Sequence, residues 1–430
     1  MYELPPLQAL APRSDDQVLN VGIVGAGIGG LTAAIALAES GHHVEIFEKS
    51  SFLKEAGAAI TAPPNFSRIL RFYGFDFRKA GATDAGDVLY YHNKSGQPTN
   101  VVPVGDYEAK FSAPWYYFHR VDLHNQLQTM VLGDPEAGSH KKRSIIRLGV
   151  TVQNIDLDGS ITLQDDTVIK KDLVVVADGI RSTFTSKIIG KAVKSEHYMS
   201  MLRFLVPSRT VLDNPETSGI FKEGLTKLRI VLGQNKSMAM YGCRNGELQN
   251  IGILFDPSLS VDENGEPLEA SDVLVKVTED FHSTFREICI GATGIGRWNL
   301  YKRSPLSKFA RGKVVVVGDA AHPMAPVRSQ GASMAGEDAA ALGILLSRVK
   351  STSEVEERLA LYNQLRVKRV AGVQTISTMH QWDSSRLSKE EASYFDERCP
   401  ETPADLDNFI LANNVIGDAW ALLNQSKNLL

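Results

Sequence analysis

The stretch VGIVGAGIGGLTAAIALAESGHHVEIFEKS, residues 21–50, decides how the chain begins to fold. A short apolar run leads into G-x-G-x-x-G, an alanine-rich segment follows, and a second apolar run ends at Glu48. The glycine spacing, the helix-forming composition and the two flanking apolar runs give the order strand, turn, helix, strand. This order predicts a βαβ unit with two parallel strands.

The three glycines of the turn have separate physical roles. Gly25 permits the tight turn, Gly27 lets backbone N–H groups come close to a pyrophosphate, and Gly30 lets the helix pack on the strand. Glu48 ends the second strand, where a carboxylate accepts hydrogen bonds from the ribose hydroxyls of an adenosine. The sequence therefore predicts a Rossmann-like dinucleotide site that includes Gly25, Gly27, Gly30 and Glu48.

Two more apolar β-branched runs, DLVVVADGIRS (172–182) and KVVVVGDAAH (313–322), read as strands of the same parallel sheet. Because these runs lie far apart in the sequence, the α/β domain is assembled from distant pieces, which we place at 17–86, 119–195 and 299–345. The intervals 87–118 and 196–298 show short alternating runs and turn sequences, and predict an antiparallel-sheet substrate domain. Residues 346–430 predict a C-terminal helical segment.

The stretch VVVVGDAAHPMAPVRSQGASMAGEDAA (314–340) places an acid at a strand end and a bare helix start after it. A second fingerprint for a separate nicotinamide domain is absent, so FAD is favoured over NAD(P) as the resident dinucleotide. Asp319 is expected to accept hydrogen bonds from the ribityl chain. Gly331 and Ala332 begin a helix whose N–H groups and dipole would face flavin N1 and the C2 carbonyl, where negative charge collects on reduction.

Composition excludes several classes of partner. The 46 Lys and Arg against 50 Asp and Glu give a formal charge of -4, which offers no basic field for nucleic acid. The cysteines Cys243, Cys289 and Cys399 form neither a C-x-x-C pair nor a disulfide framework, and no histidine spacing indicates a metal site. With no secretory signal and no membrane span expected, we predict a cytoplasmic protein, monomeric or homodimeric.

Taken together, these motifs resemble the class A FAD-dependent aromatic monooxygenases of the salicylate hydroxylase-like type. The glycine fingerprint resembles theirs, residues 172–182 look like their D-G motif, and residues 311–342 look like their G-D motif. Residues 57–70, 119–123 and 361–370 match lesser signatures, so the resemblance spans nearly the whole chain.

The resemblance implies an NAD(P)H- and O2-dependent hydroxylase of a small aromatic substrate, phenol- or salicylate-like or derived from a polyketide in secondary metabolism. NADPH or NADH acts as a transient co-substrate that reduces FAD, and a flavin C4a-hydroperoxide delivers one oxygen atom, provided that water is kept out. The residues leave open whether the outcome is hydroxylation, decarboxylative hydroxylation, dearomatisation or epoxidation. The alternative function is a flavin-dependent epoxidase, or an oxidase or dehydrogenase, that acts on a secondary metabolite.

Four further cofactor residues are implied by the resemblance. Arg120 is expected to contact FAD, with a salt bridge as the alternative, and Asp178 to support FAD and nicotinamide binding, with a simple turn paired to Arg181 as the alternative. Ala59 stands where the family more often has glycine, so backbone contact with the flavin stays open to it. Thr61 could face either the flavin or the core.

Arg203 and Tyr241 are the predicted catalytic pair. Both stand in apolar runs of the substrate sheet, where a buried guanidinium needs a partner and a buried phenol seeks one. Family members place an Arg and a Tyr similarly to bind a substrate oxygen. The alternative is an Arg–carboxylate strut and a core tyrosine.

Three other residues are expected to be structural. His322 follows the G-D motif, and we expect it to satisfy backbone or phosphate groups rather than to act as a base. Tyr362 and Arg366, at i,i+4 spacing on a helix, predict a packing and salt-bridge face.

Overall fold

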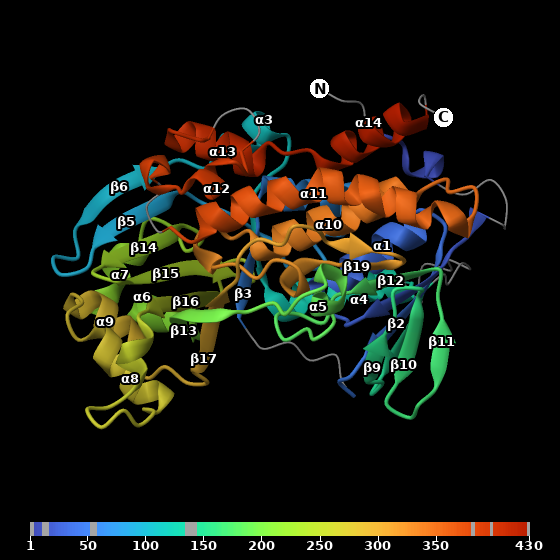
Figure 1. Ribbon diagram of the computed structural model, residues 1–430. Helices are drawn as coiled ribbons and strands as arrows, with labels where there is room; N and C mark the ends of the chain where they lie inside the picture. The colour runs from blue at the N-terminus through green and yellow to red at the C-terminus, as the bar shows by residue number, and fades with distance from the viewer. Residues whose placement is uncertain are drawn as a thin grey trace.

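The computed structural model describes residues 4–10, 17–51, 58–133, 144–379, 383–395 and 399–427. Figure 1 shows a six-stranded sheet and a seven-stranded sheet at opposite sides of the molecule, with the C-terminal helices along one side. The predicted α/β class is confirmed.

The six-stranded sheet has the order β18-β19-β12-β1-β2-β8, and all its pairs are parallel except β18 with β19. Its strands are β1 (Asn20–Val24), β2 (His43–Glu48), β8 (Ser144–Leu148), β12 (Leu173–Val176), β18 (Ala310–Arg311) and β19 (Val314–Val316). The three apolar runs of the sequence become the adjacent strands β1, β12 and β19, as predicted. Every residue of β12 and β19 is buried, because both faces of the sheet are covered.

Helices cover one face of this sheet and a small sheet covers the other. The covering helices are α1 (Ile28–Glu39), α4 (Arg120–Leu132) and α10 (Gly331–Leu346). The small antiparallel sheet consists of β9 (Val152–Ile155), β10 (Ser160–Leu163) and β11 (Val168–Lys170). Helices α1 and α10 pack so closely that a methyl group at Gly343 would collide with the backbone of Ala36.

The seven-stranded sheet has the order β17-β13-β16-β15-β14-β5-β6. Its strands are β5 (Val88–His92), β6 (Pro98–Val102), β13 (Glu196–Pro207), β14 (Leu228–Gly233), β15 (Lys236–Cys243), β16 (Leu248–Phe255) and β17 (Gly296–Lys302). The predicted antiparallel sheet is present with one exception, because β5 pairs with β14 in parallel. No hairpin connects these two strands, which come from distant segments, so no turn sets their relative direction.

Helices cover the outer face of the seven-stranded sheet. Apolar side chains of the sheet and of these helices pack together as a buried core. These helices are α6 (Ser208–Asp213), α7 (Pro215–Phe221), α8 (Ala270–Thr278) and α9 (Ser283–Cys289). The inner face meets a third antiparallel sheet, formed by β3 (Ala59–Ala62), β4 (Thr83–Asp84) and β7 (Tyr116–His119). The inner face therefore lies toward the strands that connect the two main sheets.

The remaining elements include short helices between the sheets and the helices of the C-terminal end. They are η1 (Leu7–Ala9), α2 (Pro64–Phe72), α3 (Tyr107–Phe111), α5 (Thr185–Ile189), η3 (Pro257–Ser260), η4 (Gly318–Ala320), η5 (Pro326–Arg328), η6 (Thr352–Glu354), α11 (Val355–Ser377), η7 (Ser384–Arg386), α12 (Lys389–Ala392), α13 (Pro403–Leu411) and α14 (Val415–Lys427). The predicted C-terminal helices are confirmed, and α14 packs against α10 and α11. Within the described ranges, no helix is both long and apolar enough to cross a membrane.

Candidate active site

The glycine-rich turn connects β1 to α1 and is closed by a 2.9 Å hydrogen bond from the Gly25 N–H to the Phe47 carbonyl. Gly25 has φ +102°, and a methyl group there would collide with the Ala177 carbonyl. A methyl group at Gly30 would collide with the Gly25 carbonyl, whereas at Gly27 it would meet no atom within 4 Å. Protein atoms therefore enclose Gly25 and Gly30, and Gly27 borders open space.

The start of α1 is bare. Its N-cap residue is Gly27, no side chain caps it, and the first turn holds no acidic residue. The first N–H groups of a helix lack intrahelical acceptors and carry the positive end of the dipole. An anion such as a pyrophosphate is their natural partner.

Glu48 lies beside this turn at the end of β2. One carboxylate oxygen accepts a 2.8 Å hydrogen bond from the Ala26 N–H, and the other accepts one of 2.8 Å from the Ser50 N–H. These bonds fix the carboxylate, and each oxygen still has a lone pair for a sugar hydroxyl.

Asp319 lies just beyond β19. Its side chain is exposed to solvent, although many protein atoms surround it. Desolvation by these atoms raises the pKa of Asp319 above its ordinary value, while the positive charges of Arg120 and Arg303 act in the opposite direction. Arg120 begins α4, and its N–H donates a 2.8 Å hydrogen bond to the Ala58 carbonyl. The fold thus brings Arg120 and Asp319 together from distant parts of the chain.

Asp178 follows β12 at the same edge of the sheet. Its Oδ1 atom is shielded from solvent and has no hydrogen-bond partner. Burial raises the pKa of this carboxyl, and a hydrogen bond with Ser182 opposes the shift. The partner is therefore Ser182 and not Arg181, which we had considered as its partner from the sequence.

The start of α10 resembles the start of α1, as predicted. Gln330 is its N-cap residue, no side chain caps the helix, and a methyl group at Gly331 would meet no atom within 4 Å. Asn65 Nδ2 donates a 2.9 Å hydrogen bond to Gln330 Oε1, while Gln330 Nε2 and Asn65 Oδ1 are buried without partners. The helix start at Gly331 and Ala332 thus lies next to a hydrogen-bond donor, Gln330 Nε2, and an acceptor, Asn65 Oδ1, that have no protein partner.

These features fit FAD. The bare α1 start suits the pyrophosphate, Asp319 suits hydroxyl groups, and the pyrimidine part of the isoalloxazine offers carbonyl acceptors and an N–H donor to the groups at the α10 start. The position of each contact remains a prediction.

Ala59 and Thr61 lie on β3, which joins the two main sheets. The Ala59 N–H donates a 3.0 Å hydrogen bond to Asn250 Oδ1, and the Ala59 carbonyl accepts one from Arg203 Nη2. Both backbone groups of Ala59 are therefore engaged by the seven-stranded sheet. The Ala59 carbonyl oxygen keeps a second lone pair, so a backbone contact between Ala59 and the flavin stays a prediction. Thr61 is buried opposite Tyr117 of β7.

Arg203 and Tyr241 meet on the inner face of the seven-stranded sheet. The two side chains form a hydrogen bond, and the Tyr241 ring lies 4.8 Å from that of Tyr117. Burial raises the pKa of the Tyr241 phenol, and the charge of Arg203 opposes the shift. The structure brings the predicted pair together, but Arg203 already donates to the Ala59 carbonyl.

One cross-strand row of residues forms the middle of the inner face. We call it the inner row, and it consists of Arg203, Gly252, Ala239, Ile230 and Tyr90. Four strand spacings separate its ends, about 19 Å. Two of these residues, Gly252 and Ala239, are small, and the end of the Met201 side chain lies close to Gly252. Solvent reaches Arg203, Ala239, Ile230 and Tyr90 in part.

A buried ionic network supports the start of α10. Asp338 accepts hydrogen bonds of 2.5 Å from His322 Nε2 and 3.0 Å from Arg366 Nε. Glu337 accepts one of 2.6 Å from Arg366 Nη1 and one of 2.9 Å from Asn65 Nδ2. The structural role of His322 fits our expectation, although its partner is a carboxylate and not a backbone or phosphate group.

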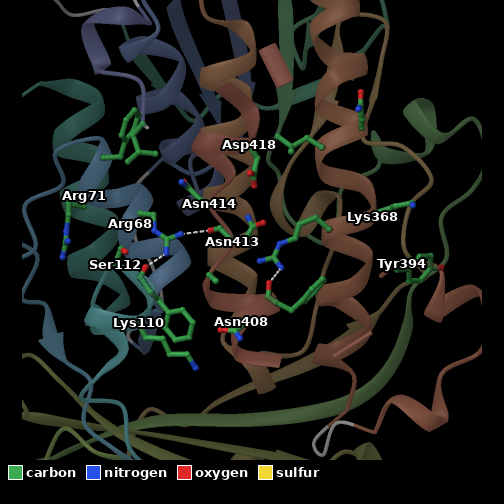
Figure 2. Close-up of a pocket in the computed structure, with 18 residues that line it drawn as sticks. Arg68, Arg71, Lys110, Ser112, Lys368, Tyr394, Asn408, Asn413, Asn414 and Asp418 are labelled. Carbon is green, nitrogen blue, oxygen red and sulfur yellow. Dashed lines mark hydrogen bonds between the residues drawn. The ribbon is translucent and has the colours of Figure 1, made fainter. Parts of the chain in front are cut away.

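One cavity of about 1070 Å³ lies between α2, α3 and the C-terminal helices, and none of the predicted cofactor or substrate residues is among those that line it (Figure 2). Its basic side chains are Arg68, Arg71, Lys110, Lys368 and Arg369. Figure 2 shows Arg68 directed at the Asn413 carbonyl, to which it donates a 2.6 Å hydrogen bond. This cavity is distinct from the glycine-rich turn and the inner row.

Four residues that sequence reasoning did not select interact electrostatically with one another, and one of them, Arg328, lies in the loop before the α10 start. They are Tyr90, Tyr107, Arg328 and Asp407. The one usable signal was Arg328, a single arginine in the proline-containing loop just before Gly331.

Comparisons with known proteins agree with this geometry. A family described as FAD binding domain matches residues 18–377. A FAD-dependent monooxygenase, phomE', from Diaporthe leptostromiformis is 30% identical over 390 residues, 88% of this chain and 96% of that protein. Hispidin-3-hydroxylase from Neonothopanus nambi is 33% identical over 385 residues, 86% of this chain and 90% of that protein.

The fold is also that of a solved structure described as a salicylate hydroxylase substrate complex. The TM-score is 0.73 at 19% identity, over 95% of this chain and 98% of that one. At this identity the likeness shows the fold alone. Because the family match and the curated relatives each cover most of the chain, the resemblance seen in the sequence is confirmed, and the chain belongs to the class A FAD-dependent aromatic monooxygenases.

Proposed function

We propose that this flavoprotein monooxygenase uses NAD(P)H and O2 to insert one oxygen atom into a small aromatic substrate that carries a phenolic oxygen. The observation that carries the proposal is the unused hydrogen-bonding capacity at the α10 start, at Gln330 and Asn65. The names of the relatives, among them hispidin-3-hydroxylase, support an aromatic substrate.

The cofactor is assigned to residues of the six-stranded sheet and of β3. Gly25, Gly27, Gly30 and the α1 start would hold the pyrophosphate, and Glu48 the ribose. Asp319 would hold the ribityl chain, with Arg120 and Asp178 beside it, and Gly331, Ala332 and Thr61 would adjoin the ring. Bound FAD supplies hydride acceptance from NAD(P)H and the activation of O2.

The protein contributes electrostatics, positioning and the exclusion of water. The α10 start places positive dipole ends where negative charge develops on the ring. Arg203 and Tyr241 would hold the substrate oxygen, and the charge of Arg203 favours the more nucleophilic phenolate. Buried side chains around Ala59, Tyr117 and Tyr241 would keep water away from this end of the inner row.

The test is spectroscopic. Purified protein should be yellow, an aromatic substrate should accelerate NAD(P)H oxidation, and ¹⁸O2 should label the product. Colourless protein that takes up no FAD would contradict the proposal. Bleaching of the flavin by substrate alone, without NAD(P)H and without O2, would instead identify an oxidase or dehydrogenase.

The proposal also includes the cellular compartment and the oligomeric state. We place the protein in the cytoplasm as a monomer or homodimer, and the free thiols of Cys243, Cys289 and Cys399 support a reducing compartment. Light scattering coupled to size-exclusion chromatography measures the oligomeric state.

A further inference from the structure

Arg328 lies next to the predicted redox end of the cofactor. It ends η5, and Ser329, in a left-handed conformation with φ 56°, and Gln330 connect it to Gly331. Three residues of chain reach about 11 Å at most, so the backbone of Arg328 stays within that distance of the α10 start.

Three separate parts of the chain converge on the Arg328 guanidinium. It interacts electrostatically with Tyr90 of β5, at one end of the inner row, and with Asp407 of α13. The Asp407 carboxylate accepts a 2.9 Å hydrogen bond from the Tyr107 hydroxyl. The cation therefore lies within electrostatic range of Tyr90, which ends the inner row, and of Asp407.

The guanidinium of Arg328 has unused hydrogen-bonding capacity. Its side chain is partly buried, and its Nε atom is shielded from solvent without a hydrogen-bond partner. No hydrogen bond or ion pair within 4 Å is found for this side chain in the part of the chain that the structure describes. A desolvated guanidinium without an acceptor is costly, and a negatively charged oxygen would satisfy it.

Three other shielded arginines already donate to backbone carbonyls. Arg203 donates to the Ala59 carbonyl, and Arg303 donates to the Ala320 and Ile180 carbonyls. Arg229 donates to three backbone carbonyls. The Arg203 Nε atom is also buried without a partner, but each of these three guanidinium groups donates to at least one backbone carbonyl, whereas no protein oxygen among the described residues accepts from Arg328.

We infer that Arg328, with Tyr90 beside it, binds a negatively charged oxygen of the aromatic substrate, a carboxylate or a phenolate, at the Tyr90 end of the inner row. This assignment rests on the proposed function and adds a second polar anchor, opposite Arg203. Because the row is about 19 Å long, an aromatic anion bound to Arg328 would lie at the Tyr90 end, against Ile230 and Ala239. The ring of the substrate then lies on apolar side chains of the inner row, and its charge lies at Arg328.

The test titrates FAD-loaded enzyme with aromatic acids and follows the flavin absorbance. The probes are 3-hydroxybenzoate, 3-amino-4-hydroxybenzoate and 6-hydroxynicotinate, each with its carboxamide and its O-methyl ether, together with hispidin. Arg328→Gln should raise the dissociation constant of the binding probe about 10- to 100-fold, the loss of one charge-assisted hydrogen bond. Arg328→Lys should recover part of the affinity, and Arg209→Gln, at an exposed position, should change nothing.

The carboxamides and methyl ethers show whether Arg328→Gln weakens binding by removing recognition of a charge or by disturbing the structure of the enzyme. If the carboxylate is the partner, wild type should prefer acid over carboxamide, and this preference should disappear in Arg328→Gln. If the phenolate is the partner, the preference over the methyl ether should disappear instead. A wild-type response that Arg328→Gln leaves unchanged would overturn the inference. Wild type that lacks FAD, or whose flavin responds to none of the probes, would count against the proposed function itself.

Discussion

His322 Nε2 and Asp338 Oδ2 lie 2.5 Å apart, and both side chains are fully shielded from solvent. Asp338 also accepts a 3.0 Å hydrogen bond from the Gly318 N–H, at the end of β19. One carboxylate of α10 therefore fixes the loop that carries Asp319. The stability of the fold and the geometry of the cofactor site depend on the same group.

The first prediction concerns acid stability. Burial alone would raise the pKa of Asp338, but its interactions with His322 and Arg366 outweigh burial and lower the pKa to about 2. Since the unfolded chain binds the proton more tightly, this stabilisation is complete above the ordinary aspartate pKa and is lost as the pH falls through about 2. Urea unfolding between pH 6 and pH 2 should show this loss.

Asp338→Asn should flatten that acid dependence. At pH 7 it should lower the free energy of unfolding by about 3–5 kcal/mol, because it leaves a buried ionic network incomplete. Asp213→Asn, which removes an exposed ion pair with Arg209, should cost less than about 1 kcal/mol. Equal effects of the two substitutions would contradict the prediction.

The second prediction separates the three glycines of the turn. Gly25→Ala and Gly30→Ala should lower the free energy of unfolding of the apoprotein by about 1–3 kcal/mol, the first through strain at positive φ and the second through collision with a carbonyl. Gly27→Ala should leave the apoprotein stable and weaken FAD binding, because its methyl group would enter ligand space. The measurements are thermal unfolding without FAD and FAD titration by fluorescence quenching.

The third prediction is that a substitution of Asp319 changes apoprotein stability and FAD affinity in opposite directions. Because the folded-state pKa of this carboxyl is raised, its ionisation disfavours the folded apoprotein as the pH rises through that pKa. Asp319→Asn should therefore raise apoprotein stability at pH 7 and lower FAD affinity. A variant that loses stability while keeping full FAD affinity would remove Asp319 from the cofactor site.

The fourth prediction concerns the predicted catalytic pair. Arg203→Ala and Tyr241→Phe should each lower substrate-dependent NAD(P)H oxidation about 10-fold or more, with FAD content unchanged. The ratio of flavin absorbance to protein absorbance provides the control. Loss of FAD from either variant would place that residue in the cofactor site.

Much of the fold could be predicted from local patterns. The strands β1, β12 and β19 were visible because a strand buried on both faces must be apolar throughout its length. The parallel pairing of β5 with β14 was not visible, since it joins segments that no turn connects. Likewise, the acid beside His322 and the use of Ala59 backbone groups by Asn250 and Arg203 depend on contacts between distant elements.

The candidate site divides in the same way. Gly25, Gly27, Gly30, Glu48, Asp319 and Gly331 could be selected because strand ends and helix starts impose residue types at fixed positions. Arg328 was passed over because its significance comes from Tyr90 and Asp407, which only the folded chain places near it. The cavity in Figure 2 gave no sequence signal, since its lining comes from several separate segments.

Helix α10 serves three purposes along its length: its start adjoins the predicted flavin site, Glu337 and Asp338 hold the ionic network, and Gly343 lets α1 pack against it. Few of its positions are free to change without affecting either redox chemistry or folding. In the inner row, Gly252, Ala239 and Ile230 are not assigned roles in both redox chemistry and folding. Directed evolution toward new substrates should therefore find its tolerated changes on that sheet face and leave the helix intact.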